Sequence, residues 1–301
     1  MSITIVGNTV VDLVFPGLTR LPEWPRHTEF TPTNLVFPPH PPIVTLGGNG
    51  ANAAYVAARC GAAVVLHTRL GADSLGGMAR RWLADAGCRV ESGRSAATAV
   101  NVTAANRRHQ RATFFYPGGD LTMPGRRAPA ASHLLVCGWP HLPRARIATG
   151  LKAARRRGSF TALDVGPILG PAWTLASLRE VFAALDLFLA NEFEVRAITR
   201  GASLDQAVLR LRRHFPGHIV IKRGARGALW MPAGADRMQP VPVRRIKAVN
   251  TVGAGDTFNG ALLALLARRI PWPAALRAAC ATAAGVARSG RGVLGVRLLR
   301  H

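Results

Sequence analysis

The chain has 301 residues, of which 49% are hydrophobic and 18% are charged, so it can bury a sizeable core and is not expected to be disordered. Its formal net charge of +24 would attract nucleotides, nucleic acids or anionic membranes. Because the basic residues fall mostly in scattered pairs, without a basic arm or an interleaved aromatic stripe, we interpret them as a solvated surface and expect no nucleic-acid partner.

The N-terminal region predicts strands and loops. Residues 4–6 are a β-branched run that predicts a first strand, and residues 10–11 read as its extension. Residues 15–45 contain many prolines among short apolar runs, which favours edge strands and loops over helices. The first residues lack the basic segment of a signal peptide, and no run of about 18 apolar residues could span a membrane. We therefore expect a cytoplasmic protein whose widely spaced cysteines are reduced thiols.

From residue 51 onward, helices and strands alternate, which predicts a parallel sheet with crossover helices. A hairpin predicted over 98–116 interrupts this alternation. We predict one α/β domain over residues 1–301, with a small β lid from about 15–45 and 92–117 that could cover a site. The predicted helices span 51–59, 75–86, 145–156, 175–184 and 204–214, with two more after Asp256 and Trp272; the predicted strands span 63–68, 133–137, 160–165, 187–190, 218–222 and 228–231.

The segment Gly48–Ala53 follows a strand, opens a helix and fits the dinucleotide-binding pattern G-x-G-x-x-A. It supports an alternative from another class, an NAD(P)-dependent oxidoreductase. A dinucleotide-binding unit normally has an acidic residue at the end of the next strand, but here that strand ends in His67, Thr68 and Arg69. A tight turn with close packing between helix and sheet explains the same glycines.

Two further motifs lie at predicted strand ends, where ligands gather in open α/β sheets. Asn191 and Glu194 could present oxygen atoms to Mg²⁺ or its waters, or they could simply cap a helix. Gly224 and Gly227, which follow Lys222, allow a planar or phosphate group to approach the backbone, or they form a plain glycine turn.

The segment Asn250–Asp256 is the most informative stretch of the chain. Gly253 and Gly255 allow a tight turn directly before a run of strong helix formers, so their amides would lie at a helix start, where anions bind. Asp256 is the only acidic residue of the segment. A carboxylate next to an anion site needs a role there, and we expect Asp256 to take a proton from an attacking hydroxyl.

In this order, the motifs resemble those of the ribokinase-like sugar kinases, also called the PfkB carbohydrate kinase family, over nearly the whole chain. The Asn250–Asp256 segment carries the most specific part of the resemblance. The other matching segments are Gly7-Asn8-x-x-x-Asp12, Gly47–Asn52, Gly71–Gly76, Asn191-x-x-Glu194 and Gly224-x-x-Gly227.

The resemblance implies a three-layer α/β domain with a central, mostly parallel sheet and a small β-sheet lid. It also implies ATP, Mg²⁺ and transfer of the γ-phosphoryl group to a hydroxyl of a sugar or sugar-like substrate. By position it implies Asp256 as the base and an anion hole of Gly253, Ala254 and Gly255. It also implies a sugar site of Asp12, Gly48 and Asn52, a nucleotide site of Asn191, Lys222, Gly224, Gly227 and Thr251, and Glu194 as a Mg²⁺ ligand through water.

The chain departs from the family at Asn250, where most members have an aspartate that helps to hold a monovalent cation. Asparagine keeps the oxygen ligand but loses the charge, which puts activation by K⁺ in question. Lid edges often pair between subunits in this family, so a homodimer through the lid is implied. A nucleoside kinase of the adenosine or pseudouridine type, and a nucleic-acid-binding protein on a kinase scaffold, stay open as alternatives.

Overall fold

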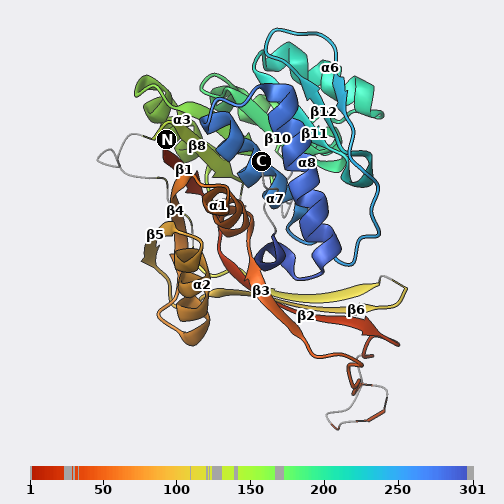
Figure 1. Cartoon of the computed structure of the whole chain (residues 1–301). Helices are drawn as coiled ribbons and strands as arrows, with labels where there is room; N and C mark the ends of the chain where they lie inside the picture. Colours follow the sequence, from red (N-terminus) through yellow and green to blue (C-terminus); the bar gives the residue numbers. More distant parts are fainter. Residues whose placement is uncertain are drawn as a thin grey trace.

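A nine-stranded sheet of order β5-β4-β1-β8-β9-β10-β11-β12-β13 runs through the centre of the protein (Figure 1). The computed structural model describes residues 2–296 except 24–28, 30, 33, 109, 120, 122, 124–130, 139–141 and 167–172. All neighbouring strands from β5 to β11 are parallel, while β12 and β13 add antiparallel. The strands are β1 Ser2–Val6, β4 Ala63–Leu70, β5 Cys88–Arg94, β8 His133–Cys137, β9 Phe160–Asp164, β10 Leu187–Asn191, β11 His218–Lys222, β12 Ala228–Met231 and β13 Gln239–Val241.

Helices cover both faces of this sheet (Figure 1). Alternate residues of the central strands point into two separate cores: Leu187 and Leu189 of β10 lie in one, and Phe188 and Ala190 lie in the other. Burial on both faces explains why these strands are continuous hydrophobic runs. The first core contains residues of α1 (Asn49–Arg59), α2 (Ser74–Asp85), α7 (Ala254–Ala267) and α8 (Trp272–Ser289); the second contains residues of α3 (Arg144–Arg156), α4 (Leu175–Phe182), α5 (Glu192–Thr199) and α6 (Leu204–His214).

A second sheet of four strands, which we call the small sheet, has the order β3-β2-β6-β7 and projects from one end of the protein (Figure 1). Strand β2 pairs antiparallel with β3 and parallel with β6, and β6 and β7 form an antiparallel hairpin. The strands are β2 Val10–Leu18, β3 Ile43–Gly47, β6 Ala99–Asn106 and β7 Arg111–Tyr116.

The side chain of Asp73 ties the small sheet to the rest of the protein. Its Oδ1 accepts a hydrogen bond from the amide of Gly76 at 2.7 Å, which caps the start of α2. Its two oxygens also accept bonds from the amide and the hydroxyl of Thr98, each at 2.7 Å. Since Thr98 directly precedes β6, one carboxylate fixes both a helix start and the base of the small sheet.

The structure confirms the predicted alternation of helices and strands, and it corrects several boundaries. Residues 10–11 do not extend the first strand; they begin β2, because the chain turns away over 7–9 into the small sheet. Among the described residues of the segment 15–45, only its two ends lie in strands, and residues 92–94 belong to β5 in the large sheet. Strands β5 and β13 were not predicted as elements, and α5 was anticipated only through the alternative that Asn191 and Glu194 cap a helix.

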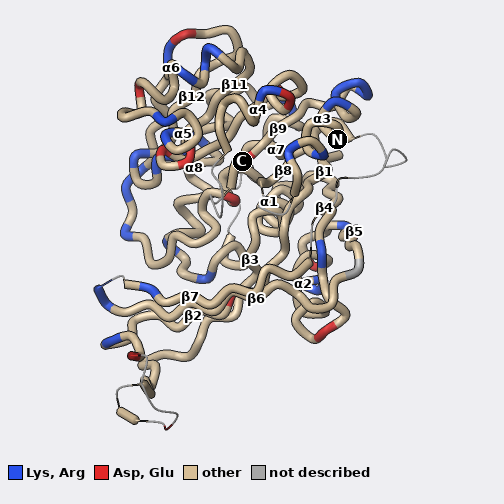
Figure 2. The backbone as a smooth tube through the Cα atoms, turned by 180° about the vertical axis from the view of Figure 1, so that it is seen from behind, with Lys and Arg blue, Asp and Glu red and all other residues tan. Residues whose placement is uncertain are grey.

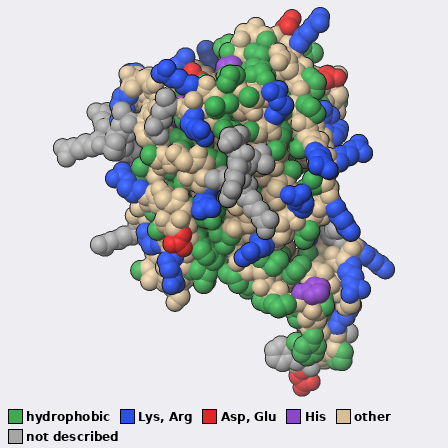
Figure 3. Space-filling view, in the orientation of Figure 1, with side chains coloured by type: hydrophobic (Ala, Val, Ile, Leu, Met, Phe, Trp, Pro, Cys, Tyr) green, Lys and Arg blue, Asp and Glu red, His purple; other side chains and the backbone are tan. Residues whose placement is uncertain are grey.

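Basic residues are distributed over many elements of the protein and are not confined to one face (Figure 2). The face shown in Figure 3 carries separate Lys and Arg side chains with apolar atoms between them. Within the described ranges, none of the helices is both long and apolar enough to cross a bilayer.

Candidate active site

The candidate site lies at the carboxyl ends of the parallel strands, where three neighbouring strands end in polar residues. Asp164, Asn191 and Lys222 are the last residues of β9, β10 and β11, and Asn191 and Lys222 are register partners. Helix α7 begins at the same edge, directly after Gly253. The sequence pointed to Asn191 and Lys222 but missed Asp164, although the same signal, a polar residue that ends a buried strand, would have found it.

Asp256, in the first turn of α7, is held by Asn52 of α1. The Nδ2 atom of Asn52 donates to Oδ2 of Asp256 at 3.0 Å, while Oδ1 of Asn52 is buried and has no hydrogen-bond partner in the described part of the chain. Burial and the charge of Asp164 raise the pKa of Asp256, although the bond from Asn52 and the charge of Lys222 act in the opposite direction. The structure therefore brings together two predicted site residues that are far apart in sequence.

The helix start before Asp256 leaves some amides unused. Gly253 has φ of 76°, a left-handed conformation that favours glycine. The amide of Ala254 donates to the carbonyl oxygen of Thr251 at 3.2 Å. One of the three amides of the expected anion hole is therefore already engaged in this conformation. Within the described residues, the amides of Gly253 and Gly255 have no such partner. These two amides are available to an anion.

Lys222 lies at the centre of a group of buried acids. Its Nζ donates to Oδ1 of Asp164 at 2.6 Å and to Oδ1 of Asn259 at 3.3 Å. Burial lowers the pKa of Lys222, but Asp164, Glu194 and Asp256 outweigh this effect and raise it, so the ammonium stays charged. A Cβ atom built on Gly255 would lie 3.6 Å from Nζ, which places the ammonium next to the unused amide.

Asn191 and Glu194 form a capping box at the start of α5. The side chain of Asn191 accepts from the amide of Glu194 at 2.8 Å, and the two oxygens of Glu194 accept from the backbone and side-chain nitrogens of Asn191 at 2.7 Å. Burial and Asp164 raise the pKa of Glu194 to about 7. In the described part of the chain, no group of three His, Cys, Asp or Glu side chains is arranged to hold a metal ion directly.

Asp12 of β2 lies on the small sheet and is buried. Its Oδ1 accepts a hydrogen bond from Nδ2 of Asn101 on β6 at 3.0 Å. Burial raises its pKa to about 6; the bond from Asn101 lowers it, and the charge of Asp256 adds to the rise. Since the charge of Asp256 on α7 reaches Asp12, the small sheet lies next to the candidate site. Asn101 was missed in the sequence, where a lone asparagine in an alternating strand gave no separate signal.

The glycines of the Gly48–Ala53 segment serve close packing. Gly48 has φ of 86°, and a Cβ atom on it would lie 2.5 Å from the carbonyl oxygen of Asn8. A Cβ atom on Gly50 would lie 2.5 Å from the backbone of Gly7. Moreover, β3 before α1 belongs to the small sheet and β4 after it belongs to the large sheet, so the unit is not the βαβ unit that binds dinucleotides.

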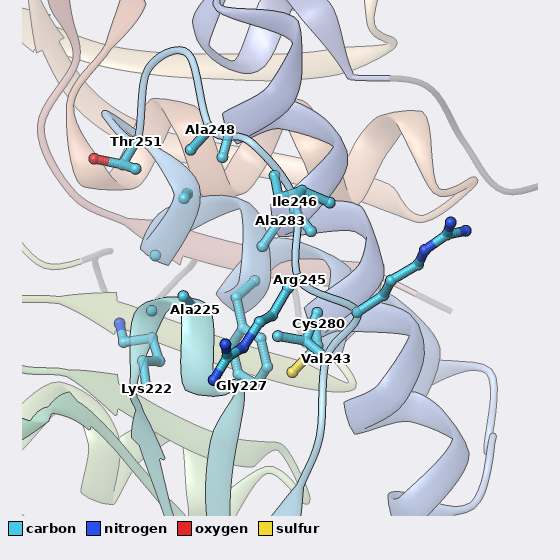
Figure 4. A pocket seen from close by; sticks show the side chains of 17 residues that line it. Lys222, Ala225, Gly227, Val243, Arg245, Ile246, Ala248, Thr251, Cys280 and Ala283 are labelled. Atoms are coloured by element: carbon cyan, nitrogen blue, oxygen red, sulfur yellow. The ribbon is translucent and has the colours of Figure 1, made fainter.

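Two cavities meet at Lys222, Gly224 and Gly255. One, of about 320 Å³, which we call the polar cavity, is lined mainly by charged and amide residues: the strand-end residues, Glu194 and Asp256. The other, of about 180 Å³, is mainly apolar and lies between the β11–β12 turn, the loop before α7, and α8 (Figure 4). Its lining includes the predicted residues Gly227 and Thr251, together with Val243, Arg245, Phe258, Cys280 and Ala283.

Two other predicted residues shape the backbone around these cavities. Gly227 has φ of 77°, and a Cβ atom there would lie 2.1 Å from the carbonyl oxygen of Val241, so the turn after β11 needs glycine. The Oδ1 atom of Asn250 accepts a hydrogen bond from the amide of Val252 at 3.0 Å, which closes a local turn before Gly253.

Comparisons with known proteins agree on one family. The model of the "pfkB family carbohydrate kinase" matches residues 24–294. The chain is 29% identical to a ribokinase of Mus musculus over 88% of its own length and 82% of that protein, and 28% identical to a deoxyribokinase of Salmonella typhi over 86% and 84%. A solved ribokinase of Arabidopsis thaliana, complexed with ribose and ATP, has the same fold, with a TM-score of 0.78 at 20% identity over 98% of this chain and 95% of that one.

Replacing Asp12 by asparagine should stabilise the protein above pH 6. The folded-state pKa of Asp12 is raised to about 6, so its favourable contribution is complete only below its unfolded pKa near 3.8 and is lost as the pH rises through 6. At pH 7.5 the ionised carboxylate should cost roughly 1–3 kcal/mol, which Asp12→Asn removes. Urea unfolding should show this gain at pH 7.5 and a smaller one at pH 5.

The control is Asp85→Asn at the exposed end of α2, which should change the free energy of unfolding by less than about 0.5 kcal/mol at either pH. An Asp12→Asn variant that is equally destabilised at pH 5 and pH 7.5 would contradict the prediction.

Proposed function

The chain belongs to the pfkB family of carbohydrate kinases and is an ATP-dependent sugar kinase, and from that premise we propose that Asp256 is its catalytic base. One observation carries this proposal. Asp256 borders the polar cavity with the Lys222 ammonium and the unused Gly255 amide, and Asn52 fixes its carboxylate. A base, a cation and an anion-binding amide thus face one space, as phosphoryl transfer to a hydroxyl requires.

The two cavities support a division of the nucleotide between them. The apolar cavity offers Val243, Phe258 and Ala283 to the adenine base, and the polar cavity offers Lys222 and Gly255 to the phosphates. Because the cavities share Lys222, Gly224 and Gly255, a nucleotide that spans both would present its terminal phosphate to Asp256. Gly224, Gly227 and Thr251 would then line the path, and Asn191 would lie beside the phosphates.

The reaction that this arrangement supports is a direct transfer. Asp256 removes the proton of a sugar hydroxyl, the hydroxyl oxygen forms a bond to the γ-phosphorus, and the bond from that phosphorus to the β–γ bridging oxygen breaks, which leaves ADP. The proton stays on Asp256 until product release. The raised pKa of Asp256 makes it a better proton acceptor, while Lys222 and the amides of Gly253 and Gly255 stabilise the charge on the transferred group.

The polar cavity also fits Mg²⁺, which prefers oxygen ligands and usually keeps several of its waters. Asp164 and Glu194 offer carboxylate oxygens there, but Asp164 is paired with Lys222 and Glu194 with Asn191. We therefore propose that both hold the ion through its waters. When bound, Mg²⁺ would neutralise phosphate charge.

Asn250 is better suited to shaping a turn than to binding a cation. Its Oδ1 is engaged by the amide of Val252, and its side chain carries no charge. We propose that Asn250 holds the turn before Gly253 and that K⁺ gains no charged ligand there.

For the sugar we propose the space between Asp256 and the small sheet. Asn52 is bonded to Asp256, and the charge of Asp256 reaches Asp12, so both are placed to bind sugar hydroxyls near the base; Gly48 lets α1 begin next to them. The relatives named above are kinases of free sugars, which favours a sugar over a nucleoside.

The four cysteines are free thiols, which supports a reducing, cytoplasmic location.

Asp256→Asn should lower kcat by about 10³-fold, because general-base catalysis typically contributes 10²–10⁴-fold. ATP affinity should change by less than about twofold, since the nucleotide cavities keep their shape. Sugar-dependent ADP formation and calorimetric titration with ATP measure the two effects. Asp205→Asn, on the exposed first turn of α6, is the control. Activity of Asp256→Asn within tenfold of the wild type would refute the role of Asp256.

Lys222→Met should destabilise the protein by about 3–5 kcal/mol and abolish measurable turnover, because it leaves the buried charge of Asp164 unpaired. In the double variant Lys222→Met/Asp164→Leu, thermal unfolding should return to near the wild-type temperature while turnover stays lost. Recovery of turnover together with stability would show that Lys222 has a purely structural role.

We also propose that the protein dimerises through the small sheet. Strand β7 is an edge strand of that sheet, and its Phe114 and Tyr116 are 56% and 47% exposed. Sedimentation velocity should show a dimer at micromolar concentration for the wild type and a monomer for Phe114→Lys/Tyr116→Lys. A wild-type monomer would disprove the proposal.

A further inference from the structure

Four residues form one row across the small sheet. Asp12 on β2 is the register partner of Thr45 on β3 and of Asn101 on β6, and Asn101 is the register partner of Phe115 on β7. Directly opposed residues share a face of a sheet. The row therefore places Thr45, Asp12, Asn101 and Phe115 on the face that carries Asp12 into the active site.

The two ends of this row differ in chemistry. At one end, the hydroxyl of Thr45 donates to the carbonyl oxygen of Arg291 near the C-terminal end of the described chain, so it is already used. At the other end, Phe115 offers an apolar ring that is 39% exposed. Between them, Asp12 and Asn101 supply the polar groups, and Asn101 is the outermost hydrogen-bonding side chain of the row.

Asn101 has one amide atom engaged and one without a partner. Its Nδ2 donates to Oδ1 of Asp12 at 3.0 Å, which fixes the orientation of the amide. Its Oδ1 is buried and, in the part of the chain that the structure describes, accepts no hydrogen bond. A buried acceptor without a donor destabilises the protein. The same holds for Oδ1 of Asn52, whose Nδ2 is bound to Asp256.

The two asparagines, Asn101 on β6 and Asn52 on α1, are therefore bonded alike. Each donates to a carboxylate, Asp12 or Asp256, and each leaves a carbonyl oxygen without a donor. A side-chain carbonyl oxygen can only accept, so the group that satisfies it must be a donor. A sugar hydroxyl is such a donor.

We infer that Asn101 determines which sugars the enzyme accepts, by requiring a hydroxyl at the part of the sugar that meets its Oδ1. This inference rests on the proposed sugar site. The favoured substrate class is a fully hydroxylated sugar, and the disfavoured one is the deoxy sugar that lacks this hydroxyl. A site built to bind a hydroxyl rejects the analogue without it, because the acceptor is then left buried and unpaired.

A purely structural role for Asn101 predicts a different result. If Asn101 only orients Asp12, its removal changes kcat/KM by the same factor for every sugar. If its Oδ1 binds one hydroxyl, its removal changes kcat/KM for the hydroxylated sugar but hardly for the matching deoxy sugar. The ratio between the two sugars therefore separates the roles.

The experiment first identifies an accepted sugar from a panel of pentoses and hexoses and then measures kcat/KM for it and for each of its monodeoxy analogues. In the wild type, loss of one particular hydroxyl other than the phosphorylated one should lower kcat/KM by about 10–100-fold. In Asn101→Ala this ratio should fall below about threefold, while the ratios for the other hydroxyls stay unchanged. Thr103→Val, two residues along the same strand and face, should keep the wild-type ratios.

Titration with ATP shows whether Asn101→Ala is folded, and Asn101→Ser gives the same ratio test should the alanine variant fail to bind ATP. Unchanged ratios in the variant, an equal loss for all sugars, or a wild type that discriminates against none of the deoxy analogues would overturn the inference. A wild type that phosphorylates no sugar would instead refute the proposed function.

Discussion

The site depends on one electrostatic constraint: three buried carboxylates, Asp164, Glu194 and Asp256, share the single ammonium of Lys222. Burial raises the pKa of Glu194 and of Asp256, and the charge of Asp164 adds to the rise, so both hold their protons more tightly than exposed acids do. Lys222 alone cannot balance three acids and a nucleotide. The Mg²⁺ proposed above would supply further positive charge. The many arginines outside stand in contrast to this acidic interior.

The fold places these groups together through strand order. Residues from β9, β10 and β11 meet because parallel strands end at one edge, and α1 and α7 begin there because each follows a glycine turn. A site built from strand ends and helix starts is rigid, since its residues are fixed by the two cores on either side of the sheet. The small sheet adds Asp12 and Asn101 from the open side.

Much of this site could be predicted from the sequence because its residues follow local rules. Asp256 and Gly253 mark a helix start, and Lys222 ends a hydrophobic strand. What could not be predicted depends on contacts between distant segments. The turn at residues 7–9 directs β2 into another sheet, but the hydrophobic pattern of residues 10–11 is the same in either sheet. The role of Asn101 follows from its register with Asp12, which the sequence does not show. The engagement of the Ala254 amide by Thr251 depends on the conformation of a turn that residue types alone do not determine.

The attachment of the small sheet has a mechanical consequence. Where the chain enters β2, Asn8 is bonded to the starts of α1 at Asn49 and Ala51; where it enters β6, Thr98 is clamped by Asp73. These hydrogen bonds hold both entry points in place, so we expect neither to act as a hinge. A substrate that enters beneath the small sheet would have to flex the free length of β2 and β6, so the stiffness of two strands, rather than the rotation of a hinge, would govern how easily the site admits a sugar.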